Sequence, residues 1–234
     1  MLCGHRGIGR GEVAGQRENT LGSFMAAADL GVPWVEMDAR LNADGVLVSH
    51  HDPSAGGRFV SELSTRETDA LGLARLEDLL TELPATLGID LELKTALEDA
   101  ARPRTQTTGA RVAELVERMP RRPLVVSSFD PSAILIFRER LAEVPIGLLV
   151  WARYPLRKAI PAAVHLGCEV LCPHVLSVVE DVRDPAESVR VAHEAGLELL
   201  VWNSLPDQRP ALVAAGVDCL CVDDLPGAVA SPPW

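Results

Sequence analysis

The chain has 234 residues, 47% of them hydrophobic, which suffices for one large core, and we expect a single domain over residues 1–234. The formal net charge of −11 argues against a nucleic-acid partner, because binding to a phosphate backbone requires a basic face. The apolar runs are shorter than the ~20 residues that span a bilayer, and "MLCGHRG" does not resemble a secretory signal, so we expect a cytoplasmic protein without an integral membrane segment.

The first predicted elements place charged residues on or after strands. The apolar segment "LCGHR" ends with His5 and Arg6, and a helix is predicted over residues 21–30. The second strand, "WVEMDAR", carries Glu36 and Asp38 on one face, since alternate residues of a strand point the same way. Their Cα atoms would lie ~6.6 Å apart. Two carboxylates this close indicate a bound cation.

Residues 42–74 interrupt the regular alternation of predicted strands and helices. "NADG" predicts a turn, "VLVSHHD" a short extended piece and "PSAGGRF" an exposed loop before the helical pattern "LARLEDLLTELP". We expect a short excursion between the second and third main strands that brings His51 and Asp52 back towards Glu36. Adjacent strand residues point in opposite directions, so only one of His50 and His51 should face the same site.

Six further strand-like segments follow, and most are separated by helical patterns. Helices are predicted over 109–119, 131–141, 155–166, 185–195 and 206–215, several with Pro near the first helical position. The strand-like segments are "LGIDLELK", "PLVVSSF", "PIGLLVW", "EVLCPHV", "LELLVWN" and "CLCVDD".

Eight strands that alternate with helices predict an α/β fold, either a closed (β/α)₈ TIM barrel or an open doubly wound sheet. Polar and aromatic residues stand at the C-terminal ends of the strands. In a barrel these ends converge on one mouth, whereas an open sheet would scatter them along an edge, so we favour the barrel. The residues at these ends are His5, Glu36, Asp38, Glu92, Lys94, Ser127, Ser128, Trp151, His174, Trp202 and Asp223.

These side chains suit the cleavage of a phosphoester. Glu36, Asp38 and Glu92 supply three oxygen donors of the kind that Mg²⁺ or Ca²⁺ prefers. Arg6 and Lys94 add positive charge, which predicts an anionic ligand such as phosphate. Because imidazoles titrate near neutrality, His5 and His51 are candidates for general acid and base. The alternative is a structural ion network that pairs the acids with Arg6 or Arg40.

From Cys3 to about Pro226, an ordered set of motifs resembles the glycerophosphodiester phosphodiesterases. The motifs are "HRG" (5–7), "ENT" (18–20), "EMD" (36–38), "DG" (44–45), "HDP" (51–53), "ELK" (92–94), "SSFDP" (127–131), "VWN" (201–203) and "GVDCLCVDDLP". The resemblance implies a barrel hydrolase that uses one divalent cation to release glycerol 3-phosphate and an alcohol from a small-molecule phosphodiester. In such enzymes a neighbouring hydroxyl of the substrate attacks phosphorus, and water then opens the cyclic phosphate.

The resemblance also implies a role for each matching residue. His5 and His51 would be the acid and base, and the "HDP" match selects His51 over His50. Trp202 matches a late aromatic position and would form a wall for the alcohol, the alternative being packing at the top of the barrel. Glu18 would either contact the substrate or have a capping or other structural role at the helix that begins near Thr20. By the same matches, Arg6 and Lys94 would hold the phosphate, and Glu36, Asp38 and Glu92 the metal.

Two other functions fit the same motifs. The first is a lysophospholipase D-like phosphodiesterase that acts on a larger lipid, since the short excursion would widen the mouth. The second is a catalytically silent barrel that binds a phosphodiester without turnover. The alcohol group, the identity of the metal, the order in which the histidines act and the oligomeric state stay open at this point.

Overall fold

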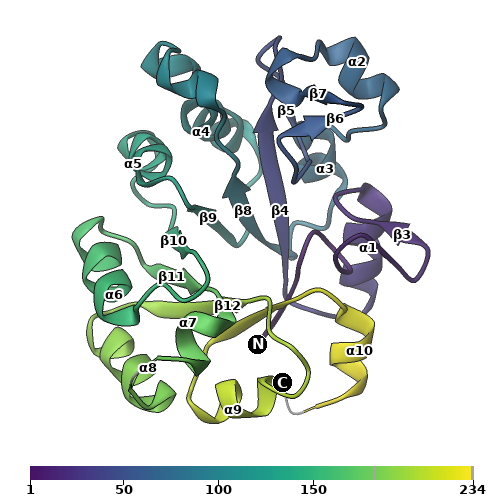
Figure 1. Cartoon of the computed structure of the whole chain (residues 1–234). Helices are drawn as coiled ribbons and strands as arrows, with labels where there is room; N and C mark the ends of the chain where they lie inside the picture. Colours follow the sequence, from purple (N-terminus) through teal and green to yellow (C-terminus); the bar gives the residue numbers. More distant parts are fainter. Residues whose placement is uncertain (182, 233–234) are drawn as a thin grey trace.

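The computed structural model describes residues 1–181 and 183–232, and its main sheet closes into a barrel (Figure 1). β1 pairs with β13 on one side and with β4 on the other, and all neighbouring barrel strands are parallel. The predicted (β/α)₈ barrel is confirmed and the open sheet is excluded. The barrel strands are β1 (Leu2–Gly4), β4 (Trp34–Leu41), β8 (Gly88–Leu93), β9 (Leu124–Ser128), β10 (Ile146–Val150), β11 (Val170–Pro173), β12 (Glu198–Trp202) and β13 (Cys219–Val222).

Helices surround the barrel, and most begin at a residue whose side chain accepts a hydrogen bond from the first turn. Thr20, Asp130 and Asp184 are such caps. The predicted helices are present, but the last of the set begins at Arg209 because residues 206–208 form a turn. The helices are α1 (Leu21–Asp29), α2 (Thr65–Ala70), α3 (Leu76–Glu82), α4 (Thr108–Arg118), α5 (Pro131–Arg140), α6 (Leu156–His165), α7 (Val175–Val179), α8 (Pro185–Glu194), α9 (Arg209–Ala214) and α10 (Leu225–Ala230). Among the described residues, we find no helix with the length and apolar character that crossing a membrane requires.

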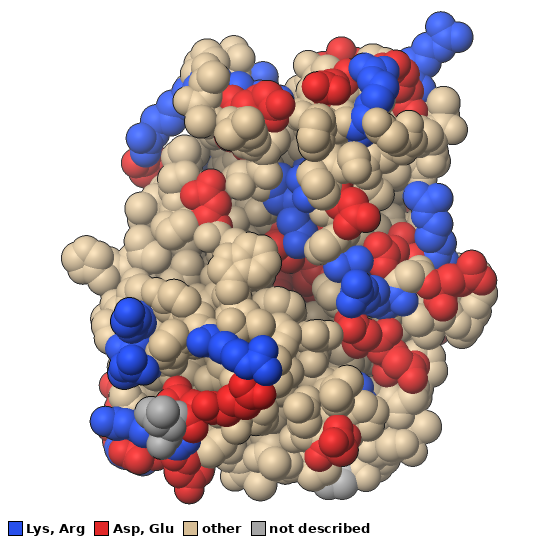
Figure 2. Space-filling view, in the orientation of Figure 1, with Lys and Arg blue, Asp and Glu red and all other residues tan. Residues whose placement is uncertain are grey.

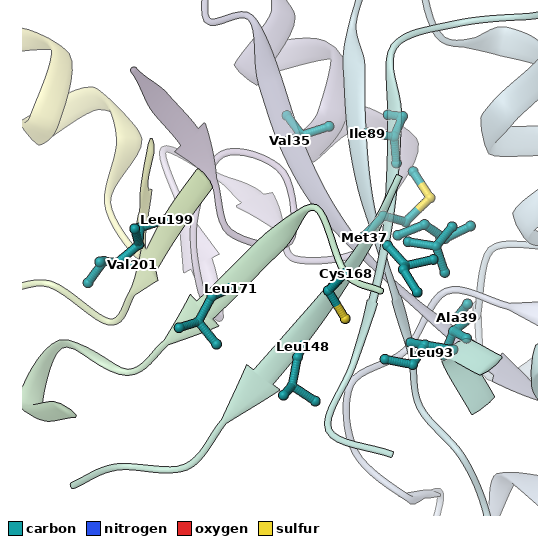
Figure 3. Close-up of a cluster of buried hydrophobic side chains, with 14 of the residues drawn as sticks. Val35, Met37, Ala39, Ile89, Leu93, Leu148, Cys168, Leu171, Leu199 and Val201 are labelled. Atoms are coloured by element: carbon teal, nitrogen blue, oxygen red, sulfur yellow. The ribbon is translucent and has the colours of Figure 1, made fainter. Parts of the chain in front are cut away.

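The barrel strands divide their side chains between two layers, because successive residues of a strand point to opposite faces. On β4, Val35, Met37 and Ala39 point outward and are fully buried in the main core against the helices. Figure 3 shows this outer layer, with side chains from β4, β8, β10, β11 and β12. The inward positions form a smaller apolar cluster that contains four of the five free cysteines, Cys3, Cys172, Cys219 and Cys221.

Towards the C-terminal ends of the strands, the inward positions change from apolar to polar or aromatic. On β8, Asp90 and Glu92 point inward, whereas Leu91 and Leu93 pack in the outer core. The same alternation on the other strands brings polar or aromatic side chains together at one mouth. These are His5, Asp38, Phe129, Trp151, His174, Trp202 and Asp223.

The predicted excursion is present between β4 and α3. Its first strand pairs antiparallel with the end of β4, and the predicted Gly-rich loop is the turn of a short hairpin with Gly56 and Gly57 at positive φ. Val48, Val60 and Leu73 form a small apolar cluster that is separate from the main core. The elements of this segment are β5 (Leu47–Val48), β6 (Ser54–Ala55), β7 (Arg58–Phe59), the 3₁₀ helix η1 (Val60–Glu62) and α2, which lie together in Figure 1.

Candidate active site

A cavity of about 560 Å³ opens at the C-terminal end of the barrel. Figure 2 shows this face, with basic side chains along a central hollow and acidic side chains deeper inside it. Seven of the nine predicted site residues line the cavity: His5, Arg6, Glu36, His51, Glu92, Lys94 and Trp202. Asp38 is fully buried and contacts Lys94 from below, and Glu18 is behind Arg6. A larger opening of about 890 Å³ at the other end of the barrel contains none of the nine residues.

The three predicted metal ligands meet at the bottom of this cavity. Oxygen atoms of Glu36, Asp38 and Glu92 all lie within 4.8 Å of one another, and the three residues are buried. Glu36 Oε1 makes no hydrogen bond within the described part of the chain, and Asp38 Oδ1 and Glu92 Oε1 share the Lys94 ammonium. A buried carboxylate oxygen without a partner is costly, and a hard cation among the three carboxylates would satisfy Glu36 and help to balance the charge of Asp38 and Glu92. The donor set therefore fits a divalent cation such as Mg²⁺ or Ca²⁺.

The charges of the cluster are unevenly distributed. Burial raises the pKa of Asp38, but Lys94, His51 and Arg6 more than offset this effect and bring it to about 2. Burial raises the pKa of Glu92 to about 7, although Lys94 opposes the rise. Burial and the charges of Asp38 and Glu92 raise the pKa of Glu36 well above its ordinary value. Binding of a cation would therefore displace protons from Glu36 and Glu92.

The two predicted phosphate-binding cations are already in contact with acids. The Lys94 ammonium lies 2.5 Å from Glu92 Oε1 and 3.2 Å from Asp38 Oδ1. Arg6 Nη1 donates to both oxygens of Glu18 at 2.9 and 3.1 Å, and Arg6 Nε lies 3.7 Å from Asp38 Oδ2. These contacts form the ion network expected as the structural alternative, with Arg6 rather than Arg40 as the partner of Asp38. Arg6 and Lys94 still line the cavity, so an anion can reach them.

The two predicted catalytic histidines stand at the cavity on different elements. His5 follows β1, and its Nδ1 contacts the Asp223 carboxylate while its Nε2 lies 3.7 Å from Glu36 Oε2. His51 lies in the excursion, with Nδ1 2.8 Å from Asp52 Oδ1. Burial and the charge of Lys94 lower the pKa of His51, so its imidazole is neutral at pH 7. His50 does not line the cavity, and its Nε2 lies 3.1 Å from the Ser54 carbonyl oxygen.

Aromatic side chains form the opposite wall of the cavity. Phe129 stacks on Trp151 with ring centroids 4.2 Å apart, and Trp202 meets Phe129 edge-on. Trp202 Nε1 donates to the Cys172 carbonyl oxygen, which fixes the indole. His174 meets Trp202 edge-on and caps α7, where its Nδ1 accepts from the Leu176 amide. The wall thus gives the cavity an apolar side.

The alternative capping role of Glu18 is not found. Thr20 caps α1 with its side chain, whereas Glu18 accepts from Arg6 Nη1 and from the Gly11 amide. Glu18 thereby orients the guanidinium that lines the cavity. It is not itself among the residues that line the cavity.

Sequence reasoning missed Asn19 and Asp90 as supports of the site, and it named Arg40 only as a possible partner of the acids. Asn19 Nδ2 donates to Asp38 Oδ2 at 2.6 Å, which orients a proposed metal ligand. Arg40 donates through Nε and Nη2 to the His51 carbonyl oxygen at 3.0 and 2.5 Å, which fixes the excursion beside the mouth. Asp90 lies one inward position below Glu92, and the period of two along "GIDLELK" could have revealed it.

Asp90 predicts a pH-dependent stability. Burial raises its pKa from 3.8 to about 7, against a hydrogen bond from Ser127 Oγ at 2.7 Å. Because its pKa is higher in the folded state, folding takes up a proton between about pH 4 and 7, and stability is lost as the pH rises through this range. Asp90→Asn is therefore expected to stabilise the metal-free protein at pH 8 by roughly 3 kcal/mol, or about 10 °C in Tm, and to change little at pH 4.

The measurement is the Tm of chelator-treated wild type and Asp90→Asn between pH 4 and pH 8. Glu92 acts in the same direction as Asp90, whereas the lowered pKa values of His51 and His174 act in the opposite direction below pH 6.5. The difference between the two proteins isolates Asp90 from these groups. Asp207→Asn, which changes an exposed carboxylate, is the control. A constant Tm difference across this range would contradict the prediction.

Comparisons with known proteins place the chain among phosphodiesterases. The model of the "Glycerophosphoryl diester phosphodiesterase family" matches residues 5–226. A Mycobacterium tuberculosis protein named "Probable glycerophosphodiester phosphodiesterase 2" is 30% identical over 227 residues, covering 88% of this chain and 81% of that protein. Glycerophosphodiester phosphodiesterase GDPD2 of Arabidopsis thaliana is 24% identical, covering 95% of this chain and 74% of the relative.

Solved structures share the fold. A phosphodiesterase from Oleispira antarctica, in complex with the product sn-glycerol-3-phosphate, superposes with a TM-score of 0.78 at 23% identity, covering 99% of this chain and 97% of that chain. A glycerophosphodiester phosphodiesterase from Thermotoga maritima superposes with a TM-score of 0.77 at 22% identity, covering 98% and 96% of the two chains. This chain and these phosphodiesterases thus share the same barrel fold.

Proposed function

The chain belongs to the glycerophosphoryl diester phosphodiesterase family, and from this membership we propose that it hydrolyses glycerophosphodiesters to glycerol 3-phosphate and an alcohol. Phosphodiester hydrolysis is the reaction class of the family. The proposal adds that a divalent cation is required and that His5 and His51 are the general acid and base. The supporting observation is the group of three buried carboxylates at the bottom of a cavity that both histidines line, with Glu36 Oε1 lacking a hydrogen-bond partner among the described residues.

The chain's own residues suggest a division of tasks. Glu36, Asp38 and Glu92 would hold the cation, which when bound supplies positive charge for the phosphoryl oxygens. Arg6 and Lys94 would bind the same oxygens from the cavity wall. Both are held in place by acids, so they are positioned before the substrate arrives.

The two histidines would move the protons of the reaction. One imidazole takes the proton of the substrate's neighbouring hydroxyl, whose oxygen then forms a bond to phosphorus. The bond from phosphorus to the alcohol oxygen breaks, and the second imidazole donates a proton to that oxygen. Water opens the resulting cyclic phosphate with the two roles reversed. The neutral state of His51 at pH 7 makes it suitable as the base of the first step.

A lysophospholipase D-like activity is the second candidate, and the rim of the mouth supports it. Leu97, Trp151, Leu205 and Phe59 are 88%, 67%, 57% and 55% exposed, and all four lie in segments that follow barrel strands on the mouth side. A side cavity of about 280 Å³, lined in part by Phe59 and Leu97, adjoins the mouth. Such a surface would accept the acyl chain of a lysolipid.

One substrate panel tests both candidates. Chelator-treated protein is supplied with Mg²⁺, Ca²⁺, Mn²⁺ or Zn²⁺ and assayed against glycerophosphocholine, glycerophosphoethanolamine, glycerophosphoglycerol and lysophosphatidylcholine. We expect metal-dependent release of glycerol 3-phosphate from the first three substrates. Release of choline from lysophosphatidylcholine alone would instead establish the second candidate. Saturable binding of glycerophosphocholine without turnover would establish a silent barrel and contradict both.

A rim variant makes the panel sharper. Leu97→Ser removes the most exposed of these four rim side chains without touching the residues proposed for the chemistry. If lysolipids are substrates, their KM should rise several-fold in this variant while turnover of glycerophosphocholine stays constant. Leu135→Ser, which changes an exposed residue on the outer helix α5, is the matched control.

A further inference from the structure

The carboxylate of Asp223 contacts the imidazole of His5 across the seam between the last and first barrel strands. β13 pairs with β1 so that Val222 is opposite Gly4, and the His5 amide donates to the Val222 carbonyl oxygen at 3.1 Å. Asp223 and His5 are therefore neighbouring inward residues just beyond the strand ends. His5 Nδ1 hydrogen-bonds to Asp223 Oδ1, and the two side chains are 15% and 34% exposed.

The backbone around Asp223 is fixed independently of this contact. The Arg10 amide donates to the Asp223 carbonyl oxygen at 3.0 Å, and the Leu225 amide donates to the Ile8 carbonyl oxygen at 3.1 Å. Gly9 permits this close approach, because a Cβ atom there would lie 2.3 Å from the Asp223 carbonyl oxygen. The segments after β1 and β13 are thus hydrogen-bonded to each other. Because their backbones are fixed in this way, the short side chain of Asp223 is held against His5.

We propose that Asp223 is a positioning residue for His5, which keeps the proton on Nδ1 and turns Nε2 towards the reaction centre. The inference deepens the proposed function and rests on it. An aspartate that accepts from Nδ1–H selects the tautomer whose Nε2 is free to take a proton, and it stabilises the imidazolium that forms. Nε2 of His5 lies on the Glu36 side of the ring, next to the three carboxylates.

The charge state of Asp223 agrees with this role. Burial alone would raise its pKa, but the hydrogen bond with His5 and the charges of His5, Arg10 and Arg6 bring the pKa below its ordinary value. Asp223 is therefore ionised at neutral pH and acts as an acceptor. Only an ionised acceptor can both fix the tautomer and favour the imidazolium.

His51 and Asp52 form a similar histidine–aspartate pair that is more exposed to solvent than His5 and Asp223. Asp52 is also within hydrogen-bond distance of an Nδ1 atom, but the two side chains are 35% and 70% exposed. Water competes more strongly for the hydrogen bonds of an exposed carboxylate, and the higher local dielectric weakens its electrostatic interaction with the imidazole. Loss of the Asp223 carboxylate should therefore reduce turnover more than loss of the Asp52 carboxylate.

The test compares Asp223→Asn with Asp223→Glu, Asp52→Asn and the exposed control Asp207→Asn. In Asp223→Asn we expect kcat to fall about 10²- to 10³-fold with KM within about threefold of the wild type. Asp223→Glu should recover at least tenfold of that loss, Asp52→Asn should lose less than Asp223→Asn, and Asp207→Asn should match the wild type. Equal losses in Asp223→Asn and Asp223→Glu accompanied by a fall in Tm would indicate a structural role and overturn the proposal, as would wild-type kcat in Asp223→Asn.

Two further measurements separate this inference from the proposed function. In a His5→Ala background, Asp223→Asn should cause no additional loss, because the carboxylate acts only through the imidazole; an additive loss contradicts the proposal. The ¹⁵N chemical shifts of the His5 ring need no turnover. At a pH at which the ring is neutral, they should report the Nδ1–H tautomer in the wild type and a changed tautomer population in Asp223→Asn. If the wild type hydrolyses nothing, these shifts still decide whether Asp223 positions His5, and identical shifts in both proteins would exclude it.

Discussion

Replacing His51 with alanine is expected to lower kcat by about 10²- to 10⁴-fold while the affinity for the divalent cation changes less than about threefold. The imidazole lines the cavity but is not a member of the group of three carboxylates. Its removal should therefore abolish proton transfer and leave the metal ligands in place. Steady-state kinetics and calorimetric titration with Mg²⁺ or Ca²⁺ measure the two quantities.

His50 provides a matched control for this experiment. It is the adjacent residue in the excursion, yet its imidazole contacts the Ser54 carbonyl oxygen instead of the cavity. His50→Ala should retain most of the activity. If His51→Ala weakens metal binding as strongly as it lowers turnover, the division between an acid–base residue and metal ligands is wrong.

Replacing Glu92 with glutamine is expected to weaken cation binding by at least about 10²-fold and to reduce turnover in parallel at limiting metal concentration. The change removes one of three clustered carboxylates and keeps the size of the side chain. Loss of an outer partner of a metal ligand already costs about 10- to 100-fold in affinity, so loss of a ligand should cost more. Excess metal should restore part of the activity, because Glu36 and Asp38 remain.

The control for Glu92→Gln is Glu98→Gln. Glu98 is an exposed residue of the 3₁₀ helix η2 (Leu97–Ala100), only six positions further along the chain. It should bind metal and turn over substrate like the wild type. Turnover by the chelated wild type at the rate of the metal-loaded protein would refute a role for the cation, and an unchanged metal affinity in Glu92→Gln would remove Glu92 from the site.

The barrel could be predicted from the sequence pattern because each strand alternates residues that face the helices with residues that face the barrel axis. Val35 and Met37 alternate with Glu36 and Asp38, and the alternation shows which residues face the helices and which face the axis. The charged and aromatic residues at successive strand ends then indicate one mouth. Spacing along the chain was enough for this step, since the closed order of the strands fixes where their ends meet.

The contacts within the site could not be predicted in the same way. The pairing of Arg6 with Glu18 depends on the conformation of the segment after β1, in which Arg6 and Asn19 have positive φ. Likewise, Asp223 reaches His5 only because the last strand closes on the first, 218 positions away in the sequence. Sequence patterns identify which side chains reach the mouth, whereas the partner of each depends on the closure of the barrel.

The small core of the excursion has a consequence for how such a protein can diversify. Val48, Val60 and Leu73 pack with one another instead of with the main core, and β5 joins the barrel through only two residue pairs with β4. Insertions or deletions between Ser54 and Gly72 therefore leave the eight parallel strand pairings and His51 untouched. This part of the excursion can vary independently of the barrel. Descendants can remodel the entrance, and with it the range of accepted alcohols, while the barrel keeps the groups proposed to bind phosphate.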